Sequence, residues 1–246
     1  MLLCRLFAWS IALIYLVACS SPAQKSSNED TAVIFLQLGE RYLQLDKLEI
    51  ARENLQHALR FDDQNAQVYN SLALLSEKLR LIDQAQVNYQ QAFALNSNDL
   101  RIKNNYGRFL CEQGDTTQGM ALLSQAATDG LNERPWLAMT NLGRCYLHIS
   151  NNTDAERYFM QALQINADYS PALLEMQKIS YAKGDMANAK AYLEHYQRVS
   201  QETAQSLLMA IKIETATGNS LLVEHYKQLL LRQFPLSQEA KILKFR

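Results

Sequence analysis

The chain has 246 residues, of which 48% are hydrophobic, and only 8 are glycine and 4 proline. This composition favours helices over a turn-rich β fold. The formal net charge is -1, and no basic stripe or run of like charges stands out. A nucleic-acid partner is therefore not expected.

The first 19 residues differ from the rest of the chain. Arg5 gives a short positive region, and residues 6–17 form an almost uninterrupted apolar run. A run of this length is too short to span a bilayer comfortably, but it is typical of the apolar part of a secretory signal. The run ends in the tetrapeptide LVAC, closing at Cys19, which resembles a bacterial lipobox.

The lipobox resemblance implies three processing steps. The Cys19 thiol would receive a diacylglycerol, residues 1–18 would leave as a signal peptide, and the new amine would be acylated. More than one acyl chain makes membrane anchoring stable. An uncleaved anchor with an incidental cysteine is the alternative.

Sorting and spacing follow from the residues after the cysteine. In sorted lipoproteins of this kind, the absence of aspartate at Ser20 implies the outer membrane, so we expect a lipid-anchored chain that faces the periplasm. Residues 19–31 are polar and serine-rich. They are expected to contain the lipidated cysteine and a flexible tether.

The remaining sequence repeats itself. A small residue recurs at spacings of 34, 34 and 36 residues, at Gly39, Ala73, Gly107 and Gly143. The series that begin at Ala51 and Ala58 show the same spacings. Small residues let two antiparallel helices approach closely, and larger ones such as Leu38, Tyr42 and Leu55 are expected to fill the space between them. This pattern resembles the tetratricopeptide repeat, a helix-turn-helix of 34 residues.

The repeat defines the predicted fold. We expect an all-α, right-handed superhelical solenoid of six tetratricopeptide repeats over residues 32–237, followed by a C-terminal tail at 238–246. The six units are predicted at 32–65, 66–99, 100–133, 136–169, 170–203 and 204–237.

Cys111 and Cys145 remain once the signal has been removed and Cys19 acylated. Both fall on first helices of neighbouring units. A disulfide is possible in an oxidising compartment, but buried free cysteines that act as small hydrophobic residues are the preferred interpretation.

No catalytic constellation is apparent. The histidines form no metal-binding pair at helical spacing, and neither a Gly-x-Ser-x-Gly elbow nor a glycine-rich phosphate loop is present. Their positions are His57, His148, His195 and His225. We therefore expect no metal, no cofactor and no enzymatic activity, and a role in binding another protein.

The concave wall of such a solenoid is built by the first helix of each unit. By the geometry of the repeat family, we expect the partner-binding groove to contain Leu36, Leu43, Asn70, Leu74, Asn104 and Arg108. The leucines would form an apolar strip beside amides that can pair with a peptide backbone. Alternatively, the leucines pack between neighbouring units. Further wall positions are Cys111, Glu112, Thr140, Arg144, Leu147 and His148.

Together, the lipobox, the tether and six repeats resemble the pilotin lipoproteins of type IV pili, the PilF/PilW family. The most specific segment is NNYGRFLCEQG, residues 104–114, which is similar to the third repeat of that family. The resemblance implies a monomeric outer-membrane lipoprotein that binds the pilus secretin and supports its localisation and multimer assembly. An adaptor for cell-wall hydrolases, or a component of the machine that inserts outer-membrane barrels, would share the anchor and the fold.

Overall fold

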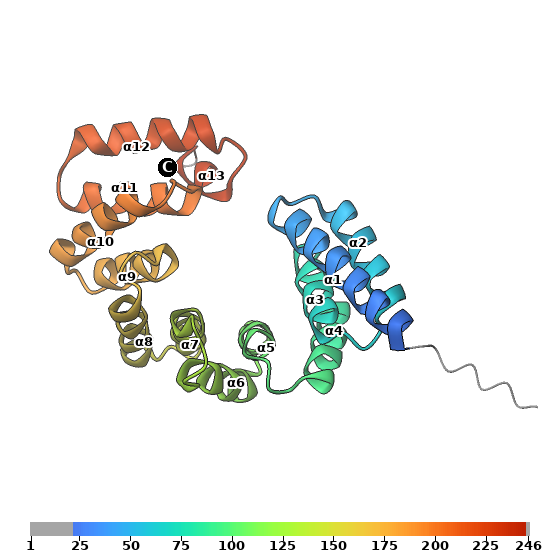
Figure 1. Ribbon diagram of the computed structural model, residues 1–246. Helices are drawn as coiled ribbons and strands as arrows, with labels where there is room; N and C mark the ends of the chain where they lie inside the picture. Colours follow the sequence, from blue (N-terminus) through green and yellow to red (C-terminus); the bar gives the residue numbers. More distant parts are fainter. Residues whose placement is uncertain (1–21, 245–246) are drawn as a thin grey trace, which may run out of the picture. The chain divides into compact units, whose positions relative to one another are not determined.

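The computed structural model describes residues 22–244, and all regular structure within them is helical (Figure 1). The helices of this range are α1 (Pro22–Gln44), α2 (Leu48–Phe61), α3 (Ala66–Lys78), α4 (Ile82–Leu95), α5 (Leu100–Glu112), α6 (Thr116–Thr128), α7 (Pro135–His148), α8 (Asn152–Ile165), α9 (Ser170–Ala182), α10 (Met186–Val199), α11 (Ala204–Ala216), α12 (Ser220–Gln233) and α13 (Gln238–Lys244). Their order as six consecutive pairs matches the six predicted repeat units and confirms the all-α fold class.

The turns repeat with the same period as the helices. One residue with a positive φ ends the first helix of each pair, at Asp46, Arg80, Gly114, Ser150, Gly184 and Gly218. A left-handed residue at this place stops a helix and reverses the chain. Glycine adopts this conformation without steric penalty, as at Gly114 with its φ of 94°.

Two compact units divide the chain between Ala85 and Gln86, within α4. In the first unit, apolar side chains of α1, α2 and α3 form one buried cluster. Gly39 makes the close approach of α1 and α2 possible, because a Cβ atom there would lie 2.7 Å from the Leu55 side chain. Phe35 adds a stack with Phe61, with ring centroids 5.7 Å apart.

The second unit contains α5 to α13 and buries several apolar clusters in succession. Gly107 and Gly119 bring the backbones of α5 and α6 together, because a Cβ atom at Gly119 would lie 2.7 Å from the Gly107 carbonyl oxygen. Gly143 likewise lets α7 and α8 approach closely, because a Cβ atom there would clash with the ring of Phe159.

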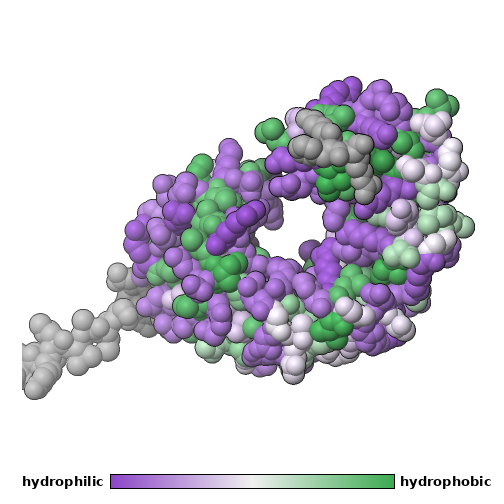
Figure 2. Space-filling model, turned by 180° about the vertical axis from the view of Figure 1, so that it is seen from behind, coloured by the Kyte–Doolittle hydropathy of each residue, from purple (hydrophilic) through white to green (hydrophobic). Residues whose placement is uncertain are grey.

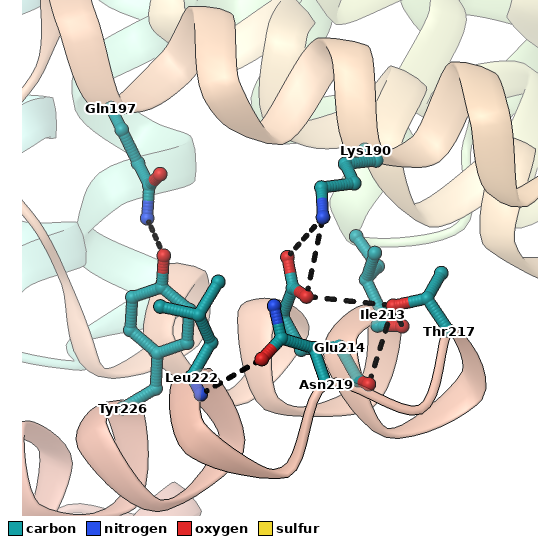
Figure 3. A network of polar contacts seen from close by, with 8 residues as sticks. All are labelled: Lys190, Gln197, Ile213, Glu214, Thr217, Asn219, Leu222 and Tyr226. Carbon is teal, nitrogen blue, oxygen red and sulfur yellow. Dashed lines mark hydrogen bonds and ion pairs between the residues drawn. The ribbon is translucent and has the colours of Figure 1, made fainter.

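Polar contacts join the last helices of the second unit (Figure 3). The Lys190 ammonium of α10 lies 3.3 Å from a carboxylate oxygen of Glu214 in α11. Glu214 also accepts from the Thr217 hydroxyl at 3.4 Å. Gln197 of α10 donates to the Tyr226 hydroxyl of α12 at 2.9 Å. These contacts fix α10 against both helices of the following pair.

Both predicted ends of the repeat domain differ from the structure. Helix α1 already begins at Pro22, inside the predicted flexible tether. Proline is well tolerated in the first turn of a helix, and extending a helix that is already formed needs little free energy. The predicted tail instead forms α13, whose Ala240 is fully buried against the last core cluster.

The signal peptide and Cys19 lie outside the residues that the structure describes. Between residues 22 and 244, no helix combines the length and the apolar character needed to cross a bilayer.

Candidate protein-binding surface

The apolar strip predicted on the first unit is not at the surface. Leu36 and Leu43 are only 8% and 6% exposed and belong to the buried cluster of α1, α2 and α3. Asn70 is also buried, at 3% exposure. The expectation of a groove lined by these three side chains was wrong, and the alternative of packing between neighbouring units is what the structure has.

The reason lies in the rotation of α1. Leu38, expected to fill the space between α1 and α2, is 41% exposed, whereas Leu36 takes the buried position. Leu74 is partly buried and packs against the same cluster. Within residues 27–44 of α1, Val33, Ile34 and Leu38 are the exposed large apolar side chains.

Asn104 and Arg108 lie on α5 in the second unit and are partly buried. The Asn104 side-chain oxygen accepts from the Asn141 amide of α7 at 2.9 Å. The Arg108 guanidinium pairs with Glu112 at 2.8 Å. These two predicted site residues therefore face other polar groups of the first helices.

A hollow of about 290 Å³ opens between α5, α7 and α9. It is lined by Arg108, Cys111, Glu112, Asn141, Arg144, Cys145, Leu147, His148 and Glu175. Most of these residues occupy repeat positions predicted for the concave wall. Asn141, Cys145 and Glu175 were not predicted. Asn141 and Cys145 each directly follow a predicted wall position in α7, whereas no wall position was predicted in α9.

Charged side chains organise this hollow. Glu175 accepts from Arg144 Nε at 3.2 Å and pairs with Lys178 at 3.0 Å, while its own side chain is only 10% exposed. Burial raises the pKa of the nearby Tyr169 hydroxyl, and the Arg144 guanidinium opposes that shift. The phenol is therefore protonated at neutral pH and adds no charge to the hollow.

Cys111 and Cys145 form a disulfide that links α5 to α7 at this hollow. The preference for free cysteines was therefore wrong. The two Cα atoms are 5.4 Å apart, within the range that a disulfide requires. The close packing of two first helices creates this proximity, which spacing along the sequence does not reveal.

The surface is mixed in character. Figure 2 shows hydrophilic side chains over much of the face in view, with smaller hydrophobic areas among them. Among residues 22–244 no group of three or more histidine, cysteine or acidic side chains is arranged to hold a metal ion. Chemically, the wall offers ion pairs and amides for contact with another polypeptide.

Comparison with known proteins agrees with the repeat architecture. The family model described as "Tetratricopeptide repeat" matches residues 66–99 and 138–169. The first match coincides with the second predicted unit. With its six helix pairs, the chain is a tetratricopeptide-repeat protein.

Two proteins of type IV pili resemble the chain over most of their length. The type IV pilus assembly protein PilF of Pseudomonas aeruginosa is 29% identical over 205 residues, which are 83% of this chain and 81% of that protein. The solved structure of P. aeruginosa PilF has a TM-score of 0.72 at 27% identity, covering 89% of this chain and 98% of that one. PilW, described as a widely conserved type IV pilus biogenesis factor, has a TM-score of 0.73 at 28% identity, covering 86% and 97%. The chain is a homologue of PilF and PilW.

Proposed function

We propose that this chain is an outer-membrane lipoprotein that binds the type IV pilus secretin and promotes its localisation and assembly into multimers. The observation that carries the proposal is homology over most of both chains to proteins named for type IV pilus assembly and biogenesis. The secretin and the outer membrane come from the family resemblance described above.

The sequence before α1 supports the anchor. The lipobox-like cysteine, Cys19, precedes the first helical residue, Pro22, by three residues. Three residues span at most about 10 Å. A lipidated Cys19 would therefore hold the start of α1 close to the membrane surface. The disulfide between Cys111 and Cys145 supports export to an oxidising compartment facing the periplasm.

The repeat domain supports a binding role. Stacked helix pairs offer an extended surface for a partner, and a scaffold of this kind can shield an aggregation-prone β-rich subunit during assembly. Of the predicted groove residues, Asn104, Arg108 and the partly buried Leu74 remain the proposed contacts. Leu36, Leu43 and Asn70 are buried and are not proposed as contacts.

Deletion of the gene, followed by complementation, tests the proposal. Secretin multimers, read from unheated membrane samples, should fall in the deletion strain and return with the wild-type chain. The Cys19→Ser variant should return fewer, because the chain would lose its anchor. An unrelated outer-membrane barrel protein serves as control and should not change. Normal multimers in the deletion strain would contradict the proposal, and a loss of the control barrel would indicate a general role in barrel insertion.

A further inference from the structure

One position of the repeat carries a positive charge in four consecutive units. Arg108, Arg144, Lys178 and Lys212 lie on α5, α7, α9 and α11, at spacings of 36, 34 and 34 residues. These spacings are those of the repeat itself. Each cation therefore occupies the same place on its first helix, and we call the four together the cationic ladder.

The helices that carry the ladder form one continuous wall within the second unit. The disulfide and the hydrogen bond from Asn141 to Asn104 join α5 to α7. The ion pair of Arg144 with Glu175 joins α7 to α9, and α9 contacts α11. The ladder consequently follows the direction in which the repeats stack.

All four cations are accessible to solvent. The side chains of Arg108, Arg144 and Lys178 are 23%, 38% and 31% exposed. Lys212 is exposed. Exposed donors at regular intervals along a wall suit a ligand that runs along it.

Two carboxylates orient the ladder without neutralising it. Glu112 pairs with Arg108, and Glu175 pairs with both Arg144 and Lys178. The contact between Arg144 and Glu175 uses Nε, whereas a guanidinium has five N–H donors in all and an ammonium has three. The ladder has four cations, and its ion-pair partners are two carboxylates, so this group keeps a positive excess while the chain as a whole has a formal net charge of -1.

We propose that the cationic ladder binds an extended acidic segment of the protein partner. Neighbouring helices pack about 8–10 Å apart, and an extended chain rises about 3.3 Å per residue. Successive rungs therefore match side chains about three residues apart. The segment that fits has about ten residues, with a carboxylate at roughly every third position. This inference rests on the proposed function only in taking a protein as the partner.

Regular acidic spacing distinguishes this ligand from a polyphosphate. Glu112 pairs with one rung and Glu175 with two, so both carboxylates lie beside the ladder and would repel a continuous phosphate backbone. They tolerate a peptide whose carboxylates are separated by neutral residues.

Fluorescence anisotropy with a labelled synthetic peptide tests the inference on the whole mature chain. The probe has ten residues, with glutamate at every third position and serine or valine elsewhere. A matched peptide carries lysine in place of each glutamate. We expect binding of the acidic peptide alone, and weakening as ionic strength rises from about 50 mM to about 500 mM, because salt screens accessible charges. Equal binding of both peptides, or no binding of the acidic one at low salt, would overturn the inference.

Variants locate the site. Lys212→Glu changes an exposed rung and should weaken binding about threefold to tenfold. Arg144→Gln removes a second rung without adding a buried negative charge, and should act in the same direction. Arg198→Glu, an equal change of charge at the end of α10 and off the ladder, is the control and should leave binding nearly unchanged. If the control variant loses as much affinity as the rung variants, the attraction is diffuse and the ladder is not the site.

The same variants separate this inference from the proposed function. Suppose that secretin multimers fall when the gene is deleted but are normal in strains that carry Lys212→Glu or Arg144→Gln. This result would support the proposed function and would exclude the cationic ladder as the contact with the secretin. Suppose instead that the rung variants weaken peptide binding but that secretin multimers are normal in the deletion strain. This result would support the cationic ladder as a binding site and would exclude the secretin as the partner.

Discussion

At the scale of single residues, small side chains determine how closely the two helices of a pair approach. Gly119 is the tightest of these positions, because an added Cβ atom would lie 2.5 Å from Cys111 Sγ, 2.7 Å from the Gly107 oxygen and 2.9 Å from the Cys111 nitrogen. Two of these three neighbours are backbone atoms, which cannot rotate away. The position therefore admits only glycine without a shift of α5 against α6.

Gly119→Ala should consequently destabilise the domain. Overpacking typically costs about 1–3 kcal/mol and exceeds the gain of about 1 kcal/mol from the better helix propensity of alanine. Urea denaturation of the soluble mature domain measures the change. Gly130→Ala is the matched control, because a Cβ atom there meets no other atom within 4 Å. Equal stability of the two variants would contradict the close packing of α5 and α6.

The Cys111–Cys145 disulfide gives a second prediction at this scale. It closes a loop with a sequence separation of 34 residues. A disulfide that closes a loop of this length typically adds about 2–4 kcal/mol to the free energy of unfolding. The Cys111→Ala, Cys145→Ala double variant should therefore unfold at lower urea concentration, and reduction should shift only the wild type. Rapid alkylation of both thiols in the folded, unreduced protein would show that the bond is absent.

At the scale of elements, the period of the repeat could be predicted because each helix pair needs small residues at its crossing and a left-handed residue at its turn. The rotation of a helix was harder to predict. Two residues along a helix turn a side chain by about 200°. The exchange of roles between Leu36 and Leu38 therefore moved the apolar strip from the groove into the core.

The candidate site could be predicted only in part, because the repeat period gives the positions on each helix but not the contacts between helices. The wall positions Arg108, Arg144 and His148 follow from the repeat and do line one hollow. The disulfide requires contact between α5 and α7, and no sequence motif predicts that contact. Residues 22–31 form the first part of α1 and extend the helix of the first repeat towards the N-terminus. Their sequence has no apolar period that would predict a helix.

The contact of α10 with α11 depends on an ion pair whose acidic partner is buried. Glu214 is 2% exposed and Lys190 is 36% exposed (Figure 3). Removing one partner of such a pair leaves a charge without compensation. Lys190→Met should therefore destabilise the domain by about 1–3 kcal/mol, less than for a fully buried pair because the lysine is partly solvated. Adding Glu214→Gln should recover part of the loss, and a double-mutant cycle in urea measures the coupling. Additive effects would show that the pair contributes nothing.

Helix α10 also begins at a titratable cap. Asp185 accepts from the Asn188 side chain at 2.6 Å and from its backbone N–H at 3.1 Å. These hydrogen bonds, the side-chain one first, lower the pKa of the Asp185 carboxyl. A lowered pKa stabilises the fold above the unfolded value of about 3.9, and this contribution is lost as the pH falls through the folded value.

Asp185→Asn keeps a capping oxygen but removes the titration. Its thermal stability at pH 7 should stay close to that of the wild type. Its further decrease between about pH 5 and pH 2.5 should be smaller, because one titrating group is gone. Parallel pH profiles of wild type and variant would contradict a role for this carboxyl in acid sensitivity.

At the scale of the whole molecule, six helix pairs and a terminal helix leave little of the described chain for any separate domain. A chain of repeats acts through its surface, and the proposed lipid anchor would determine where that surface is presented. Homology to PilF and PilW places the chain among proteins of type IV pilus biogenesis. The proposed function requires direct contact between the repeat domain and the secretin.

Capture of the secretin from detergent-solubilised outer membranes by the affinity-tagged chain tests that claim most directly. The wild-type chain should retain the secretin after washing. The Cys19→Ser variant, added as purified protein, should retain it as well, because the contact belongs to the repeat domain and not to the lipid. Recovery of neither secretin monomer nor multimer by either protein, with both folded by circular dichroism, would contradict the account.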